Sequence, residues 1–257
     1  MIEINNLSLE QNKIKSLENI NIRINEGEII GVIGESGSGK TALLKTIAGI
    51  SPKYTGEILL TNRSLQSYKK NLLNQLLSCS FEEIPHNNDD TVFDFLLQSR
   101  IPYKKFLNPF SEYDIQITEE CLHQFNLNTY KNNKILSLPG AILKRCHLAY
   151  CFIREAKVTI LDNPTSDLDF HSIFTLQRYM SKYVMDGNKI IIIASNDLNF
   201  VIQTSDRIII LKDGEIALEG THNMIDGETI KKYFNIDIIY SKNIYNGKPV
   251  INLFPMN

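Results

Sequence analysis

The sequence lacks a strong excess of charge of either sign and any long hydrophobic run. Its 27 Lys and Arg against 29 Asp and Glu leave a formal net charge of −2. That balance gives no electrostatic basis for binding nucleic acid and no basic face for an anionic membrane. The longest aliphatic run, "IIIIA" at residues 190–194, is far too short for a helix that spans a bilayer, which needs about 20 residues.

Closely paired cysteines and a secretion leader are missing as well. The four cysteines, at positions 79, 121, 146 and 151, form no C-x-x-C pair. We therefore expect buried free thiols in a reducing compartment instead of a metal site or a disulfide framework. The first residues are not a charged segment followed by an apolar one, so secretion is not indicated. A soluble cytoplasmic protein is expected, and docking on a membrane partner stays open.

What is present is enough hydrophobic sequence for a large core. The chain has 257 residues, 43% of them hydrophobic, which allows one large domain or two small ones. In the first third, two segments alternate apolar and polar residues as half-exposed antiparallel strands do. A denser apolar strand, a segment with helical spacing and another strand follow them. These five segments are residues 2–9, 17–24, 28–34, 40–50 and 56–60.

The pattern changes in the middle of the chain and again in the last third. Between about residues 82 and 155, apolar residues recur at three- and four-residue spacing, which predicts a helical insert whose helices are separated by Pro102 and Pro109. Continuous β-branched runs then alternate with helical segments, as in a parallel sheet covered on both faces. The runs are residues 158–162, 189–195 and 207–214, and the helices are 170–184 and 197–203. Two further strand-like pieces, "IDIIY" and "KPVINLF", follow.

A glycine-rich loop lies between the strand at 28–33 and the helix after it. "GESGSGKT", residues 34–41, fits G-x-x-x-x-G-K-[ST] in the strand–loop–helix context that this motif requires. Glycines permit a tight loop whose N–H groups converge on phosphate oxygens, and the helix N-terminus adds a positive dipole end. Lys40 reaches the terminal phosphates, and the Thr41 hydroxyl suits Mg²⁺. The candidate nucleotide ligands are Gly34, Ser36, Gly37, Ser38, Gly39, Lys40 and Thr41.

An acidic residue ends the buried strand "VTIL" at 158–161. The carboxylate of Asp162 is placed there to hold Mg²⁺, directly or through water, together with Thr41. A lone Asp at a strand end is more often a turn former or a cap. The phosphate loop elsewhere in the chain makes the metal role the better interpretation.

Together these motifs resemble the ATP-binding subunit of an ABC transporter over nearly the whole chain. "GESGSGKT" matches the family's Walker A motif, and "VTILDNPTSDLD" is close to its Walker B motif with the following turn. "DRIIILKDGEIALEGTHNMI" is similar to the strand–turn–strand after the family's switch region. The insert "TVFDFLLQSRIPYKKFLNPFSEYD" and the tail "IKKYFNIDIIYSKNIYNGKPVINLF" look most like subunits that serve importers of iron chelates, haem and cobalamin.

The resemblance implies a fold, cofactors and partners. The fold is α/β, a P-loop NTPase of the ABC type with a mostly parallel core sheet, an antiparallel β subdomain and a helical insert. Residues 1–222 would form the nucleotide-binding domain, with its core at 1–81 and 156–222 and its insert at 82–155, and residues 223–257 a C-terminal extension. ATP and Mg²⁺ are the implied cofactors. The implied partners are a second copy or a related subunit, bound head to tail, and membrane permease subunits at the inner face of the cell membrane.

Five positions depart from the family pattern. The catalytic Glu after Walker B matches Asn163, and the switch His matches Asn196. The Q-loop Gln matches Glu82, give or take one residue, and the aromatic that stacks on adenine falls near Gln11. The signature Leu-Ser-Gly-Gly-Glu matches "LPGAI", that is Leu138, Pro139, Gly140, Ala141 and Ile142.

Each departure removes a chemical group that hydrolysis uses. A general base typically contributes about 10²–10⁴-fold to a rate, and the Asn163 amide can hold a water but cannot usefully accept its proton. Asn196 keeps a hydrogen-bond donor without a cation, and Pro139 has neither a hydroxyl nor an N–H. A carboxylate at Glu82 is unfavourable beside phosphate unless it ligates Mg²⁺ or replaces the base. We expect a subunit that binds MgATP and hydrolyses it weakly or not at all.

Two alternatives stay open on the sequence. One is an active transport ATPase that tolerates unusual catalytic residues. The other is a soluble ABC protein that scaffolds or regulates without a transporter. The apolar faces of the insert, which resemble a docking surface for a membrane subunit, argue against the second. Whether the chain is an enzyme is therefore left open, and the cargo cannot be inferred because other subunits select it.

Overall fold

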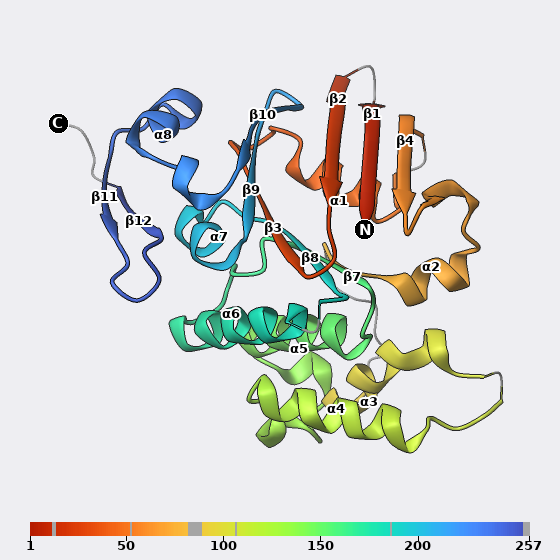
Figure 1. Ribbon diagram of the computed structural model, residues 1–257. Helices are drawn as coiled ribbons and strands as arrows, with labels where there is room; N and C mark the ends of the chain where they lie inside the picture. Colours follow the sequence, from red (N-terminus) through yellow and green to blue (C-terminus); the bar gives the residue numbers. More distant parts are fainter. Residues whose placement is uncertain (12–13, 52, 82–88, 106, 186, 254–257) are drawn as a thin grey trace.

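A computed structural model describes residues 1–11, 14–51, 53–81, 89–105, 107–185 and 187–253. These residues form a largely parallel six-stranded sheet, an antiparallel four-stranded sheet beside it, helices on both faces of the larger sheet and a C-terminal hairpin (Figure 1). The expected α/β fold of the ABC type is confirmed. Within the described ranges, no helix has the length and apolar character needed to cross a membrane.

The antiparallel sheet is built on two strands in which the alternation of buried and exposed side chains changes phase part-way along the strand. On β1 the buried side chains shift from Ile2 and Ile4 to Leu7 and Leu9, because Asn6 adopts a left-handed conformation with φ of 50° and moves the register by one residue. Asn tolerates this conformation better than most residues. The strand order is β2-β1-β4-β5, with β1 at Ile2–Gln11, β2 at Ile14–Ile24, β4 at Thr55–Leu60 and β5 at Arg63–Ser64.

The larger sheet places three buried strands at its centre. Its order is β10-β9-β3-β8-β7-β6, and every pairing is parallel except that of β10 with β9. Strands β7 and β8 are buried along their whole length, as their continuous β-branched sequences predicted. The strands are β3 (Glu28–Ile33), β6 (Leu77–Ser80), β7 (Val158–Asp162), β8 (Ile190–Ala194), β9 (Arg207–Lys212) and β10 (Glu215–Gly220).

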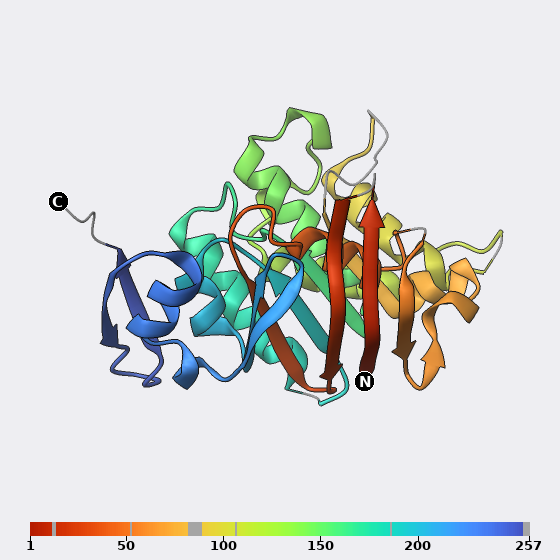
Figure 2. The ribbon, with the colours of Figure 1, turned by 90° about the horizontal axis from the view of Figure 1, so that it is seen from above.

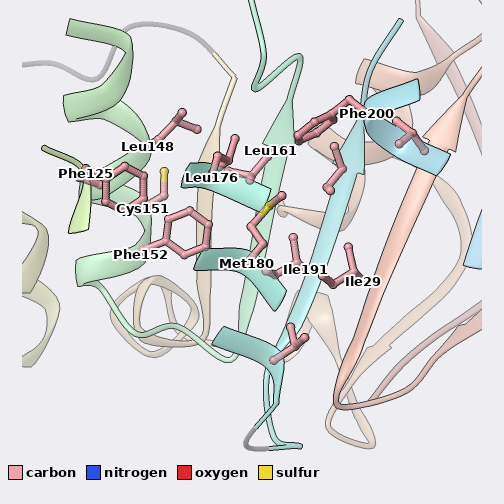
Figure 3. Packing of buried hydrophobic residues seen from close by; sticks show 14 of the residues in the cluster. Ile29, Phe125, Leu148, Cys151, Phe152, Leu161, Leu176, Met180, Ile191 and Phe200 are labelled. Atoms are coloured by element: carbon pink, nitrogen blue, oxygen red, sulfur yellow. The ribbon is translucent and has the colours of Figure 1, made fainter. Parts of the chain in front are cut away.

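Both faces of this sheet are covered by apolar cores. Ile29 and Ile191 pack with side chains of three helices on one face, the cluster of Figure 3, whereas Ile30 and Ile192 pack on the other face with α1 and the antiparallel sheet. Full burial of such a side chain contributes about 1.5–3 kcal/mol. The three helices are α5 (Gly140–Ile153), α6 (Phe170–Val184) and α7 (Leu198–Thr204), and α1 spans Lys40–Ile47.

Two helices of the predicted insert, α3 and α4, begin with matching caps. Thr91 and Asp94 form a capping box at the start of α3, and Ser111 and Asp114 form another at the start of α4. Pro102 lies inside a 3₁₀ segment that continues α3, whereas Pro109 precedes α4 as expected. A helix that the sequence pattern did not predict, α2, comes just before β6. The elements are α2 (Lys70–Leu76), α3 (Val92–Leu97), the 3₁₀ segment Gln98–Tyr103 and α4 (Glu112–Gln124).

The C-terminal segment folds into a helix and a two-stranded hairpin at the opposite side of the molecule from β4 (Figures 1 and 2). The side chain of Asn199, on α7, pairs with the backbone of Ile251, donating to its carbonyl at 2.8 Å and accepting from its N–H at 2.7 Å. Lys248 donates to the last carbonyls of α7. The helix is α8 (Gly227–Phe234), and the strands are β11 (Ile238–Lys242) and β12 (Pro249–Leu253).

A buried arginine joins α4 to the end of α5 within the insert. Arg100, 5% exposed, donates to the Asp114 carboxylate at 2.8 Å, to the Glu155 carboxylate at 3.1 Å and to the carbonyl of Ile153 at 2.9 Å. Burial raises the pKa of Asp114, but hydrogen bonds from Ser111 and Arg100 outweigh this effect and hold the pKa below its ordinary value. The carboxylate therefore stays charged beside the guanidinium.

We expect Asp114→Asn to destabilise the protein by about 3 kcal/mol at pH 7, because it leaves the Arg100 charge buried without its partner. Urea unfolding measures the difference. Since the folded pKa is lowered, the contribution of Asp114 is present above about pH 4, the ordinary Asp value, and the gap between the two proteins closes as pH falls. The control is Glu112→Gln, at an exposed position of the same helical turn, expected within about 0.5 kcal/mol of wild type. Equal stability of both variants would contradict the role given to Asp114.

Candidate nucleotide-binding site

The glycine-rich loop passes from β3 into α1 between neighbouring backbone segments. A Cβ on Gly34 would lie 2.3 Å from the carbonyl oxygen of Leu211, and one on Gly39, at φ of 103°, would lie 2.7 Å from that of Ser16. Only glycine fits either place. The loop is therefore fixed between β9 and β2.

Lys40 holds its ammonium group across this loop. Its Nζ donates to the carbonyl oxygens of Gly34 at 2.8 Å and Glu35 at 2.9 Å, and the residue is 8% exposed. Burial lowers the pKa of Lys40, and the charge of Asp162 opposes that shift. A cation held by backbone carbonyls at a helix N-terminus is well placed to meet an anionic phosphate.

Thr41 and Asp162 meet although 121 residues separate them. The Thr41 hydroxyl donates to Oδ2 of Asp162 at 2.6 Å, and Asp162 is 8% exposed. Asp162 ends β7, and Thr41 lies in the first turn of the helix that follows β3. A hydroxyl and a carboxylate oxygen side by side are hard ligands that suit Mg²⁺ when substrate oxygens and waters complete its shell.

A cavity of about 330 Å³ joins the phosphate loop to Asn163 and Asn196, the two asparagines expected at catalytic positions of the family. That volume is within the range of small-molecule sites. Asn163 and Asn196 follow the ends of β7 and β8, and their side of the cavity faces Lys40 and Thr41. The lining residues are Lys15, Ser16, Ser36, Gly37, Gly39, Lys40, Thr41, Ala42, Asn163 and Asn196.

The backbone conformation at position 163 favours asparagine. Its φ is 44°, in the left-handed region where Asn is common and Glu is not. The Asn163 N–H donates to the Ala194 carbonyl at 2.8 Å, while its carbonyl accepts from Ser166 Oγ at 2.9 Å and Lys144 Nζ at 3.2 Å. Its side-chain amide donates to Asp162 at 3.3 Å. The residue therefore supports the Asp162 carboxylate and contributes no acidic group.

The predicted signature segment is not part of this cavity, because none of residues 138–142 lines it. Pro139 instead caps the start of α5 without a side-chain hydrogen bond, and a Cβ on Gly140 would meet no atom within 4 Å. Gln11 ends β1, and Glu82 lies outside the described residues.

The sequence did not predict three residues that contribute to the site. Lys15 and Ser16 line the cavity from β2, and Lys144 contacts the carbonyl of Asn163 from α5. Lys15 and Ser16 lie 19 and 18 residues before Gly34, where the phosphate loop begins, and carry no motif of their own. Lys144 is four residues after Gly140 on one helix, and that spacing is the signal that places it on the same helix face.

Residues 17–166 match the model of the ABC transporter family. The chain belongs to the ABC transporter family. An uncharacterised ABC transporter ATP-binding protein of Methanocaldococcus jannaschii is 33% identical to it over 91% of each chain. The petrobactin import ATP-binding protein FpuC of Bacillus anthracis is 26% identical, over 93% of this chain and 88% of the relative.

The fold is shared with solved structures of the family. A dimeric ATP-binding cassette bound to ADP and Pi in a post-hydrolysis state superposes with a TM-score of 0.75 at 24% identity. The superposition covers 86% of this chain and 98% of that one. Domains of the ABC family bind ATP, and the phosphate loop, Lys40 and the Thr41–Asp162 pair of this chain fit the phosphates and the metal of that ligand.

We expect Lys40→Ala to weaken MgATP binding by at least about 100-fold, because it removes the cation that lies over the loop and its charge-assisted hydrogen bonds. Isothermal titration calorimetry measures the dissociation constants. The control is Lys69→Ala, an exposed lysine just before α2, which should bind like wild type. If wild type shows no heat of binding at millimolar MgATP, or if the two variants bind equally, the site is misassigned.

Proposed function

We propose that this chain is the ATP-binding subunit of an ABC importer and that it binds MgATP with weak or absent hydrolysis. The observation that carries the proposal is the contact between Thr41 and Asp162 beside an amide at Asn163. The groups that hold phosphate and metal are together, and the group that would take a proton from water is replaced. MgATP binding is therefore retained without the base that a fast hydrolase needs.

Mg²⁺ in this proposal is held by Thr41 and Asp162, and it would neutralise charge on the phosphates. Their side chains already point to each other at 2.6 Å, so both oxygens are available on one side of the loop. Asn163 donates to the second Asp162 oxygen and so helps to fix the carboxylate. Glu82, proposed as the Q-loop residue, lies outside the described residues.

Dimerisation head to tail would complete the nucleotide site. Residues 138–142 do not line the cavity of their own chain, which fits a role opposite the phosphate loop of a partner. In that arrangement Pro139 and Ala141 take the place of a hydroxyl and a glycine, so the partner's nucleotide meets fewer donors. A base at position 163 would not restore the hydrogen-bond donors that the 138–142 segment lacks.

The importer group and the location proposed for this subunit rest on the same resemblance. FpuC is by its name a petrobactin importer subunit, in agreement with the importer group for iron chelates, haem and cobalamin that the insert and tail suggest. Permease subunits at the inner face of the membrane are the proposed partners. We assign residues 1–222 to the nucleotide-binding domain, 82–155 of them to the insert, and residues 223–257 to an extension.

We expect Asn163→Glu alone to release phosphate at well below about 1 s⁻¹, the low end of common enzyme turnover. The new carboxylate repairs one group, while Asn196 and the 138–142 segment stay as they are, and φ of 44° disfavours Glu. Steady-state phosphate release is measured with the purified protein, alone and with its permease. The control is Asn163→Gln, because glutamine has the shape of glutamate without its charge. Turnover of about 1 s⁻¹ or more in Asn163→Glu alone would show an otherwise competent ATPase.

We expect the segment from about Glu82 to Tyr113 to dock on a permease subunit. Ile101 and Leu107 are 55% and 86% exposed in it, so cysteines placed at these two positions should cross-link to a membrane subunit. The native thiols interfere little, because three are buried and burial raises the pKa of the fourth, Cys79, to about 12. Glu228→Cys on α8, at the other side of the molecule, is the control. Capture of soluble proteins alone would favour the scaffold alternative.

A further inference from the structure

A second cavity, of about 510 Å³, lies between α4 of the insert and α6, which are stacked in the lower half of Figure 1. It shares no lining residue with the cavity at the phosphate loop. Ile117 and Cys121 line it from α4, Tyr179 and Tyr183 from α6, and Phe152 from α5. Its volume is in the range that holds small organic molecules.

The walls of this cavity are aromatic and fixed in place. The Phe152 ring packs edge-on against Tyr179 at 5.0 Å and against Tyr183 at 5.1 Å between centroids. Tyr179 Oη has a weak hydrogen-bond partner in Cys121 Sγ at 3.4 Å. A phenol with such a partner keeps the capacity to donate to a better acceptor.

The charged side chains around the cavity differ in the hydrogen bonds and ion pairs that they already form. The Glu155 carboxylate accepts from Arg100 and Tyr113, and Lys189 donates to the Glu155 carbonyl while it lies 5.5 Å from the Tyr183 ring. Lys182, on the α6 side, has no ion pair within the part of the chain that the structure describes. This cation therefore remains available to an incoming anion.

We propose that this cavity binds a small planar aromatic acid, with its ring against Phe152, Tyr179 and Tyr183 and its acidic group toward Lys182. Rings recognise a flat apolar ligand by edge and face contacts, and a lysine at the mouth fixes which end stays in water. Glu120, which lines the cavity from α4, repels an anion from that side and orients the acid toward α6. The occupant touches the insert and the core together, so its binding stabilises their mutual position.

Two dyes that differ in one group test this proposal on the full chain without nucleotide. Anilinonaphthalene sulfonate carries an acid, and N-phenyl-1-naphthylamine is the same molecule without it. We expect wild type to bind the sulfonate at least about tenfold more tightly, and Lys182→Gln to lose about tenfold in sulfonate affinity with no change for the neutral dye. Arg178→Gln, an exposed charge on the same helix, should leave both affinities unchanged.

A variant that fills the cavity distinguishes dye binding in the cavity from dye binding on other apolar surface. Ile117→Trp should abolish saturable binding of both dyes, whereas Ile115→Trp, at a 42% exposed position of the same helix, should not. Benzoate should displace the sulfonate dye from wild type. Equal wild-type affinities for the two dyes, or sulfonate binding that Lys182→Gln leaves unchanged, would overturn the proposal. If Ile117→Trp fails to fold, the Lys182→Gln comparison alone decides.

Discussion

The hydrogen bond from Thr41 to Asp162 depends on the central constraint of this fold, the parallel pairing of β3, β8 and β7. Parallel neighbours end at the same edge of a sheet, so the residues that follow them are brought together whatever their separation in the chain. Burial on both faces fixes the register, because a slip of one residue would exchange the two cores. The phosphate loop, Asp162, Asn163 and Asn196 meet at this edge for that reason.

Binding and chemistry impose different demands on such a site. Binding uses backbone N–H groups, Lys40 and two hard oxygens, all of which are in place at the edge of the sheet. Hydrolysis also needs a proton acceptor and charge stabilisation that act only in the transition state. Asn163 provides neither, and it is held by hydrogen bonds to three elements, namely β8, α5 and the turn that contains Ser166. The backbone around it is adapted to asparagine.

Specific polar contacts join segments of the chain in two peripheral parts. Arg100 joins α4 to the end of α5 within the insert, through two carboxylates and backbone carbonyls. The C-terminal hairpin is attached to α7 by the Asn199 side chain, which pairs with Ile251 as a neighbouring strand would. Helix α7 begins two residues after Asn196. The hairpin therefore stabilises the helix that follows Asn196, the residue expected at the switch position.

The sequence alone determined whatever depends on neighbours in the chain. Gly34 to Thr41 specify a loop by spacing, and the runs that form β7 and β8 predict strands buried on both faces. The family resemblance named Asn163 and Asn196 as well. Only the tertiary structure decided the rest: the phase change at Asn6, the role of Lys144, the place of Lys15 in the cavity and the aromatic cavity between α4 and α6. These features arise from contacts between distant segments, and such contacts have no fixed spacing in a sequence.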